Sequence, residues 1–145
     1  MPPEALSPDA LFGLTGPLTL LGWAALCAYP LAPRAITALA LAIPAMLSLL
    51  YAALVLSFWA GATGGFGSLA QVMALFDQPE IALAGWVHYL AFDMLVGLWI
   101  VRTARDRGIP HLIVLPCLPL TFLFGPAGFL AFLILATALP KRTSA

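Results

Sequence analysis

Charge is scarce in this sequence. Only 8% of its 145 residues are Asp, Glu, Lys or Arg, and the net charge is zero, whereas a soluble domain carries about 25% charged residues. The six Lys and Arg residues never cluster with aromatic residues into a basic stripe, which argues against nucleic acid as a partner. Because 63% of the residues are hydrophobic, we predict one integral membrane domain over residues 1–145.

Metal-binding and cofactor-binding patterns are also missing. Cys27 and Cys117 lie singly in apolar runs, without the paired spacing of a zinc site or a disulfide framework, so we expect two buried, hydrophobic cysteines. His88 and His111 would lie about 20 Å apart along a helical bundle, too far to share one haem. Asp93 has no second acid inside a predicted span. We therefore expect no metal and no cofactor.

Long apolar runs predict an all-α membrane protein, a bundle of four transmembrane helices. At about 20 residues per crossing, the runs at 11–29, 36–59, 81–101 and 112–139 each have room for one span. The fourth run contains three prolines and two glycines, so we expect a kinked or broken helix there. Between the second and third spans, apolar residues at near-helical spacing predict a short amphipathic helix on the membrane surface; these are Phe66, Leu69, Val72, Met73 and Phe76.

Basic residues in the connections predict the orientation. Arg34 lies between the first two spans, and the turn between the last two holds Arg102, Arg105 and Arg107. Cytoplasmic connections are enriched in Lys and Arg, so we expect both termini in the periplasm, although Lys141 and Arg142 follow the last span. The first ten residues include no Lys or Arg, unlike a secretory signal or an organelle transit peptide. We therefore expect a multi-pass protein of the bacterial inner membrane.

One carboxylate lies inside a predicted span. At the helical rise of 1.5 Å per residue, Asp93 is about 3 Å from the midpoint of the third span. A charge at that depth costs about 3 kcal/mol on insertion scales, so such a residue is a functional candidate that faces the bundle interior. An apolar medium favours the neutral carboxyl group, which can donate a proton. A structural aspartate that hydrogen-bonds another helix is the alternative.

The neighbours of Asp93 divide by helical face. Tyr89 and Trp86 precede it by four and seven residues, and Gly97 follows it by four, so these residues share its face. His88 is five residues away, about 140° around an ideal helix. It does not form a simple dyad with Asp93 unless the helix bulges, and both a packing role and a catalytic role stay open for it.

Polar residues of other spans lie at a similar depth. The second span offers Ser48 and Tyr51, and the fourth offers Thr121. They could close a pocket around Asp93, because the prolines of the fourth span leave carbonyl groups without their helical donors. In the alternative, Thr121 hydrogen-bonds its own helix and the prolines only shape that helix.

Two stretches resemble a known family. GWVHYLAFDMLVGLWIVRTARDRGIPH and LPCLPLTFLFGPAGFLAF, within about residues 84–132, resemble the abscisic acid-deficient four-like family of small membrane proteins, whose plant members are needed to make neoxanthin from violaxanthin. The resemblance implies a carotenoid isomerisation without oxygen or a redox cofactor. An epoxide opens and a nearby hydrogen is removed to leave an allene, which needs a general acid and a base.

The resemblance also implies roles for residues. Asp93 would be the acid, and Tyr89 or His88 would assist it or act as the base. Aromatic side chains would line a groove for the polyene, namely Trp86, Phe92, Phe122 and Phe124. Two other classes remain open: a non-catalytic subunit that binds a pigment, a lipid or another membrane protein, and a proton-coupled carrier. A four-span carrier would need to assemble as a homo-oligomer.

Overall fold

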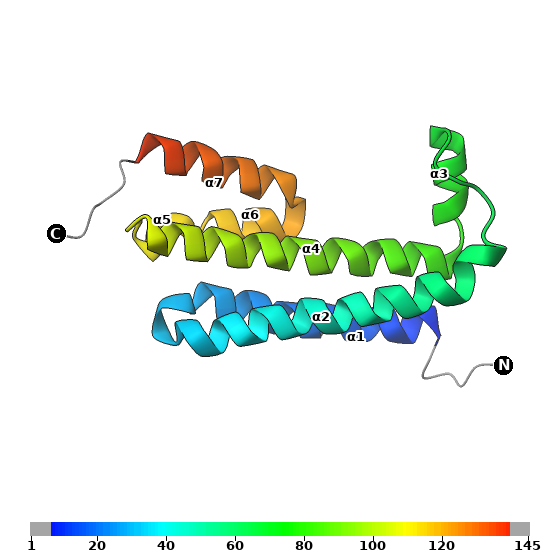
Figure 1. Cartoon of the computed structure of the whole chain (residues 1–145), viewed down its shortest axis with the longest axis horizontal. Helices are drawn as coiled ribbons and strands as arrows, with labels where there is room; N and C mark the ends of the chain where they lie inside the picture. The colour runs from blue at the N-terminus through cyan, green and yellow to red at the C-terminus, as the bar shows by residue number, and fades with distance from the viewer. Residues whose placement is uncertain (1–6, 140–145) are drawn as a thin grey trace.

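The computed structural model describes residues 7–139, and every regular element in that range is helical. Three long helices, α1 (Pro8–Cys27), α2 (Pro33–Phe58) and α4 (Pro79–Asp106), run along one another (Figure 1). Each is long and apolar enough to cross a membrane. The predicted all-helical fold is therefore confirmed for the described residues, and three of the four predicted spans correspond to helices that could cross a membrane.

Local sequence explains where these helices start. Ser7 caps α1 by accepting a hydrogen bond from the Ala10 N–H, and Pro8 takes a first-turn position, where a missing N–H costs nothing. Pro33 and Pro79 open α2 and α4 in the same way. Short 3₁₀ turns, η2 (Tyr29–Leu31) and η3 (Trp59–Gly61), follow α1 and α2.

Helix α4 is the centre of the bundle. Half of its most apolar 18-residue stretch is buried, against 28% for α1 and for α2. Glycines allow the close approach that drives helix association in lipid. A Cβ atom on Gly97 would lie 2.8 Å from the Trp23 ring, and one on Gly22 would lie 2.5 Å from Met94. Through these contacts, the face of α4 that carries Met94 and Gly97 packs against α1.

The C-terminal region differs from the predicted fourth span. It forms α5 (His111–Val114), α6 (Cys117–Phe124) and α7 (Pro126–Ala138), and the chain reverses at Gly125, where φ is +22°. Figure 1 shows α6 and α7 as a hairpin along one half of α4. At 1.5 Å per residue, α7 is about 20 Å long, shorter than the hydrocarbon core of about 30 Å. The four-span bundle is therefore not confirmed.

The hairpin returns to the end of the bundle from which it starts. The Nη2 group of Arg107, at the end of α4, donates a hydrogen bond to the Ala136 carbonyl in the last turn of α7. Helix α1 begins at the opposite end (Figure 1). The expectation that both termini share one side is not supported, because hydropathy measures apolar length and cannot detect a reversal. Lys141 and Arg142 lie outside the described residues.

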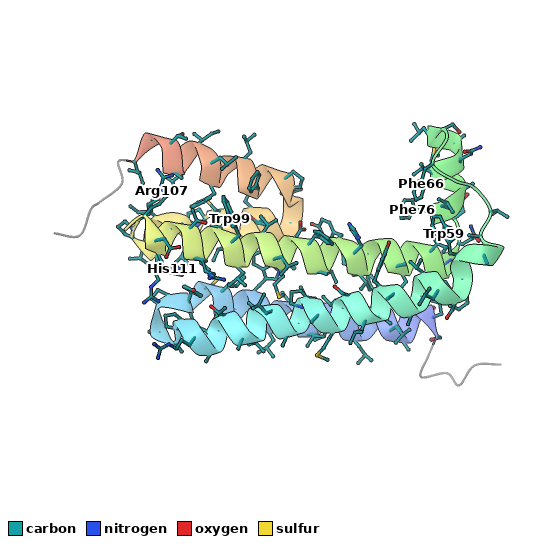
Figure 2. The ribbon with its side chains drawn as sticks, in the orientation of Figure 1. Trp59, Phe66, Phe76, Trp99, Arg107 and His111 are labelled. Carbon is teal, nitrogen blue, oxygen red and sulfur yellow. The ribbon has the colours of Figure 1, made fainter. Side chains whose placement is uncertain are left out.

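Helix α3 (Leu69–Phe76) stands at a steep angle to the long helices and projects to one side at the end of the bundle where α4 begins (Figure 1). Ser68 caps it by accepting a hydrogen bond from the Gln71 N–H. Its large apolar side chains are mostly exposed, and Figure 2 shows Phe66 and Phe76 close to Trp59. The Trp59 and Phe66 rings stack at 5.4 Å. The predicted amphipathic helix is present, and its position on the membrane surface stays a prediction.

The two cysteines have different surroundings. Cys117 is buried, as expected, whereas Cys27 is exposed. The expectation for Cys27 was wrong because it lies on the outer face of the last turn of α1. Its carbonyl oxygen accepts a hydrogen bond of 2.9 Å from Nε2 of His111, so His111 joins the start of α5 to the end of α1.

Candidate active site

Asp93 lies at the middle of α4 and is 9% exposed. Its carboxyl group packs against the reversal of the hairpin. A Cβ atom on Gly125 would lie 2.5 Å from Oδ1 and 3.2 Å from Oδ2 of Asp93. The free-energy cost of a carboxyl group in lipid predicts that Asp93 faces the bundle interior, and it does so, beside the reversal at Gly125. The Oδ2 atom of Asp93 is buried and has no hydrogen-bond partner among the described residues.

Tyr89 connects this face of α4 to the hairpin. Its hydroxyl group donates a hydrogen bond of 3.0 Å to the Phe122 carbonyl. Phe122 is four residues before Pro126, which has no N–H to offer that carbonyl, so Tyr89 replaces the missing helical donor. The side chains of Tyr89 and Asp93 are direct neighbours, one helical turn apart. The two polar groups therefore lie next to each other on one face of α4, and the hydroxyl group of Tyr89 bonds to the hairpin.

A cavity of about 230 Å³ lies beside this pair, between α1, α4 and α6. Its wall is mainly apolar, formed by side chains that include Leu20, Trp86, Phe122 and Leu123. Two polar side chains reach it, Thr19 and Tyr89, and the Thr19 hydroxyl already donates to the Thr15 carbonyl at 2.6 Å. Asp93 does not line the cavity. Tyr89 is therefore the group of the pair that a ligand in the cavity would touch.

The cavity is small for a complete ligand site. Ligand pockets usually enclose about 300–1,000 Å³, so this one has room for part of a long lipid-like molecule. Trp86 is 40% exposed and its ring stacks on Tyr89 at 5.7 Å. The arrangement suits a ligand with one end beside Tyr89 and the remainder in the surrounding lipid.

Trp23 was not predicted as a site residue. It is 5% exposed, and its ring packs 5.6 Å from the Phe122 ring. Its buried Nε1 group has no hydrogen-bond partner among the described residues, although buried tryptophan N–H groups usually have one. The available signal was the spacing of Thr15, Thr19 and Trp23 at intervals of four residues, which places them on one face of α1.

Thr121 does not face Asp93 across a pocket but has the alternative role expected from the sequence, a hydrogen bond within its own helix. It is completely buried, and its hydroxyl group donates to the Cys117 carbonyl at 2.7 Å, one turn earlier in α6. The hairpin packs tightly at this point, because Thr121 occupies the space that a side chain on Gly128 would need. Thr121 therefore hydrogen-bonds its own helix.

Several predicted residues do not gather around Asp93. His88 stacks on Phe92 at 4.6 Å and lies 5.5 Å from the Tyr51 ring, toward α2. Ser48 is exposed on α2, and Phe124 is 62% exposed on α6. A single pocket that joins these five residues to Asp93 is not supported. Similar depth in the membrane does not determine the helical face on which a side chain lies.

The comparisons with known proteins agree with the resemblance noted in the sequence. A family model described as ABA DEFICIENT 4-like matches residues 10–132. The match runs from the start of α1 into α7 and includes Asp93, Tyr89, Phe122 and Gly125. No curated protein and no solved structure matches the chain. Because the family model covers most of the sequence, this chain belongs to the ABA DEFICIENT 4-like family.

Proposed function

We propose that this protein binds a carotenoid or related isoprenoid lipid within the membrane and isomerises it by acid–base chemistry. One observation carries the proposal. The buried carboxyl group of Asp93 has a free oxygen and lies directly behind Tyr89, and Tyr89 lines an apolar cavity between the helices. A buried acid that contacts a lipid-facing cavity through a single phenol is suited to moving a proton where water is scarce.

The ligand class follows from the cavity wall. Apart from Thr19 and Tyr89, the side chains that line it are apolar, and Trp86 and Phe122 offer aromatic rings. Such rings supply large apolar contact area to an end ring or a polyene. Because the cavity volume is about 230 Å³, we place one end of the ligand inside and the rest of the chain in the bilayer.

The proposed reaction opens an epoxide and leaves the elemental composition unchanged. The Tyr89 hydroxyl donates its proton to the epoxide oxygen as the C–O bond breaks, and neutral Asp93 returns a proton to Tyr89. A nearby carbon then loses its proton to the Tyr89 oxygen while Tyr89 passes its own proton to the Asp93 carboxylate, and the C–H electrons form the new double bond. Asp93 thus acts through Tyr89, because Asp93 does not line the cavity.

We place the protein in the bacterial inner membrane with its arginine-bearing connections in the cytoplasm. Arg34, Arg102 and Arg105 lie at the same end of the bundle, and cytoplasmic connections favour basic residues. The end of α7 lies on that side as well, because Arg107 bonds to Ala136. The start of α1 then faces the periplasm.

Coexpression with enzymes that make an epoxycarotenoid tests the proposal. We expect a new pigment of unchanged mass, which is lost with Tyr89→Phe and with Asp93→Asn. Tyr51→Phe is the matched control, because the Tyr51 ring lies against His88 and away from the cavity. Each variant is first checked for membrane level and for a single peak in gel filtration.

Two results would contradict the proposal. In one, several epoxycarotenoids and their deoxy precursors remain unchanged in cells that contain the folded protein. In the other, the purified protein retains a carotenoid in stoichiometric amount but never converts it. The second result would favour the non-catalytic binding subunit.

A further inference from the structure

A second polar region lies at the end of the bundle opposite α3, near the α1–α2 turn and the end of α4. Three adjoining hollows of about 420, 430 and 440 Å³ occur there, and Arg105 borders all three. We propose that this region binds the phosphate group of an anionic membrane lipid. The proposal is independent of the chemistry at Asp93.

The cationic side chains of the region come from two different helices. Arg34 is in the first turn of α2, while Arg102 and Arg105 are near the end of α4. Together with Tyr29, Thr37 and Asp106 they border one of the hollows, which we call the arginine groove. All three arginines are exposed, so their guanidinium groups are free to turn toward a ligand.

The charge of the groove matches a phosphate. Three arginines border it and only one carboxylate, Asp106, opposes them. Guanidinium groups bind phosphate oxygens through paired, charge-assisted hydrogen bonds. The membrane orientation rule requires only that basic residues lie on one side. It does not require arginines from two helices to border the same hollow, and that convergence indicates a site.

The floor of the region favours a lipid as the source of the phosphate. Tyr29 is 5% exposed, borders the arginine groove and one adjoining hollow, and shares a hydrogen bond of 3.2 Å with the Thr37 hydroxyl. The adjoining hollow is otherwise walled largely by apolar residues such as Val101 and Ile109. Because α2 begins and α4 ends here, and both helices are long and apolar enough to cross a membrane, we place the groove at the level of the lipid phosphates. A headgroup could place its phosphate at the arginines and its glycerol above the apolar floor.

Native mass spectrometry of the full chain in neutral detergent tests this site. The probes are short-chain phosphatidylglycerol, phosphatidylcholine of equal chain length, and inorganic phosphate. We expect phosphatidylglycerol adducts at far lower lipid concentration than phosphatidylcholine adducts. Arg105→Gln should reduce phosphatidylglycerol occupancy about fivefold to tenfold, as expected for loss of charge-assisted hydrogen bonds. Raising the ionic strength should weaken binding as well.

Charge variants at both ends of the bundle sharpen the test. Arg34→Gln, on the other helix, should reproduce the loss seen with Arg105→Gln. Asp106→Asn removes the opposing carboxylate and should increase occupancy. Glu80→Gln, in the first turn of α4 at the far end, is the control and should leave occupancy unchanged. A general change in folding would lower phosphatidylglycerol occupancy in both variants. Lower occupancy with Arg105→Gln and higher occupancy with Asp106→Asn therefore indicate a local site.

Three outcomes would overturn the proposal. Equal adducts with phosphatidylcholine and phosphatidylglycerol would show that charge does not select the lipid. Unchanged occupancy in folded Arg105→Gln and Arg34→Gln proteins would place the lipid elsewhere. Binding of inorganic phosphate without any phosphatidylglycerol adduct would identify a site for a soluble anion and end the assignment to a lipid.

Discussion

The dipeptide Gly-Pro occurs twice in this chain, with opposite structural results. Gly16-Pro17 lies within α1, and the helix continues to Cys27. Gly125-Pro126 ends α6, reverses the chain and opens α7. A Cβ atom on Gly16 would meet nothing within 4 Å, whereas one on Gly125 would meet the carboxyl group of Asp93.

The difference shows that tertiary contacts, and not the dipeptide, determine the reversal. A residue before proline is biased away from the α-helical region in both places. At Gly125, however, α4 supplies the hydrogen-bond donor that the end of α6 lacks, because the Tyr89 hydroxyl group donates to the Phe122 carbonyl. Asp93, also on α4, packs against the glycine. Structural breaks of this kind can mark functional sites in membrane proteins.

The strongest test of the comparison asks whether the second Gly-Pro reverses the chain. In a background of Cys27→Ser and Cys117→Ala, single cysteines are introduced as Ala32→Cys, Thr137→Cys and Ser68→Cys, all at exposed positions. A membrane-impermeant maleimide should label positions 32 and 137 from the same side and position 68 from the other, because α7 returns to the end where it began. Labelling of position 137 together with position 68 would show a fourth crossing and refute the hairpin.

Alanine at each of the two glycines should have unequal effects. Gly125→Ala should lower the free energy of unfolding by about 3 kcal/mol, because it combines a strained φ with a contact of 2.5 Å to Asp93. Gly16→Ala should be neutral or stabilising by up to about 1 kcal/mol, since alanine favours helix and nothing opposes its Cβ. Unfolding in mixed detergent micelles, followed by circular dichroism, measures both.

A double variant separates the two causes of the loss at Gly125. Adding Asp93→Ala to Gly125→Ala removes the close contact but retains the backbone strain, so it should recover part of the lost stability. Equal stability of the two single glycine variants would mean that the carboxyl group does not hold the reversal in place.

The smallest expected effect concerns the carbonyl that Pro126 leaves without a donor. Tyr89→Phe should cost about 1 kcal/mol, because it removes the hydrogen bond to Phe122 within the membrane. Tyr51→Phe removes the same atom from a tyrosine outside this contact and should cost less. The same micelle unfolding assay compares the two variants, and a larger loss at Tyr51 would argue against this account of the break.

Hydropathy and spacing predict the long helices but not the hairpin. Helices α1, α2 and α4 form from uninterrupted apolar runs, and the short amphipathic pattern became α3. The run from 112 to 139 is equally apolar and long enough for a crossing. Its reversal depends on a positive φ at Gly125 and on Asp93 of another helix, and no local pattern specifies that contact.

The sequence predicts those parts of the candidate site whose residues lie on one face of a single helix. Asp93, Tyr89 and Trp86 follow helical spacing, and the resemblance indicated Phe122. Only their depth along the second span points to Ser48 and Tyr51, and α2 directs both side chains away from Asp93. The spacing of Trp23 places it on one face of α1 with Thr15 and Thr19, but its contacts with Phe122 and Gly97 depend on other helices and no local pattern predicts them.

The short C-terminal hairpin makes the two ends of the bundle unequal. Toward the arginine-bearing end, α5, α6 and α7 lie beside the three long helices, whereas beyond the α6–α7 turn the hairpin no longer accompanies α4 (Figure 1). The described part of the chain is therefore wider at the arginine-bearing end. In a membrane crossed by the long helices, a change in lateral pressure at this wider end is expected to reach the contact between Gly125 and Asp93 through the hairpin.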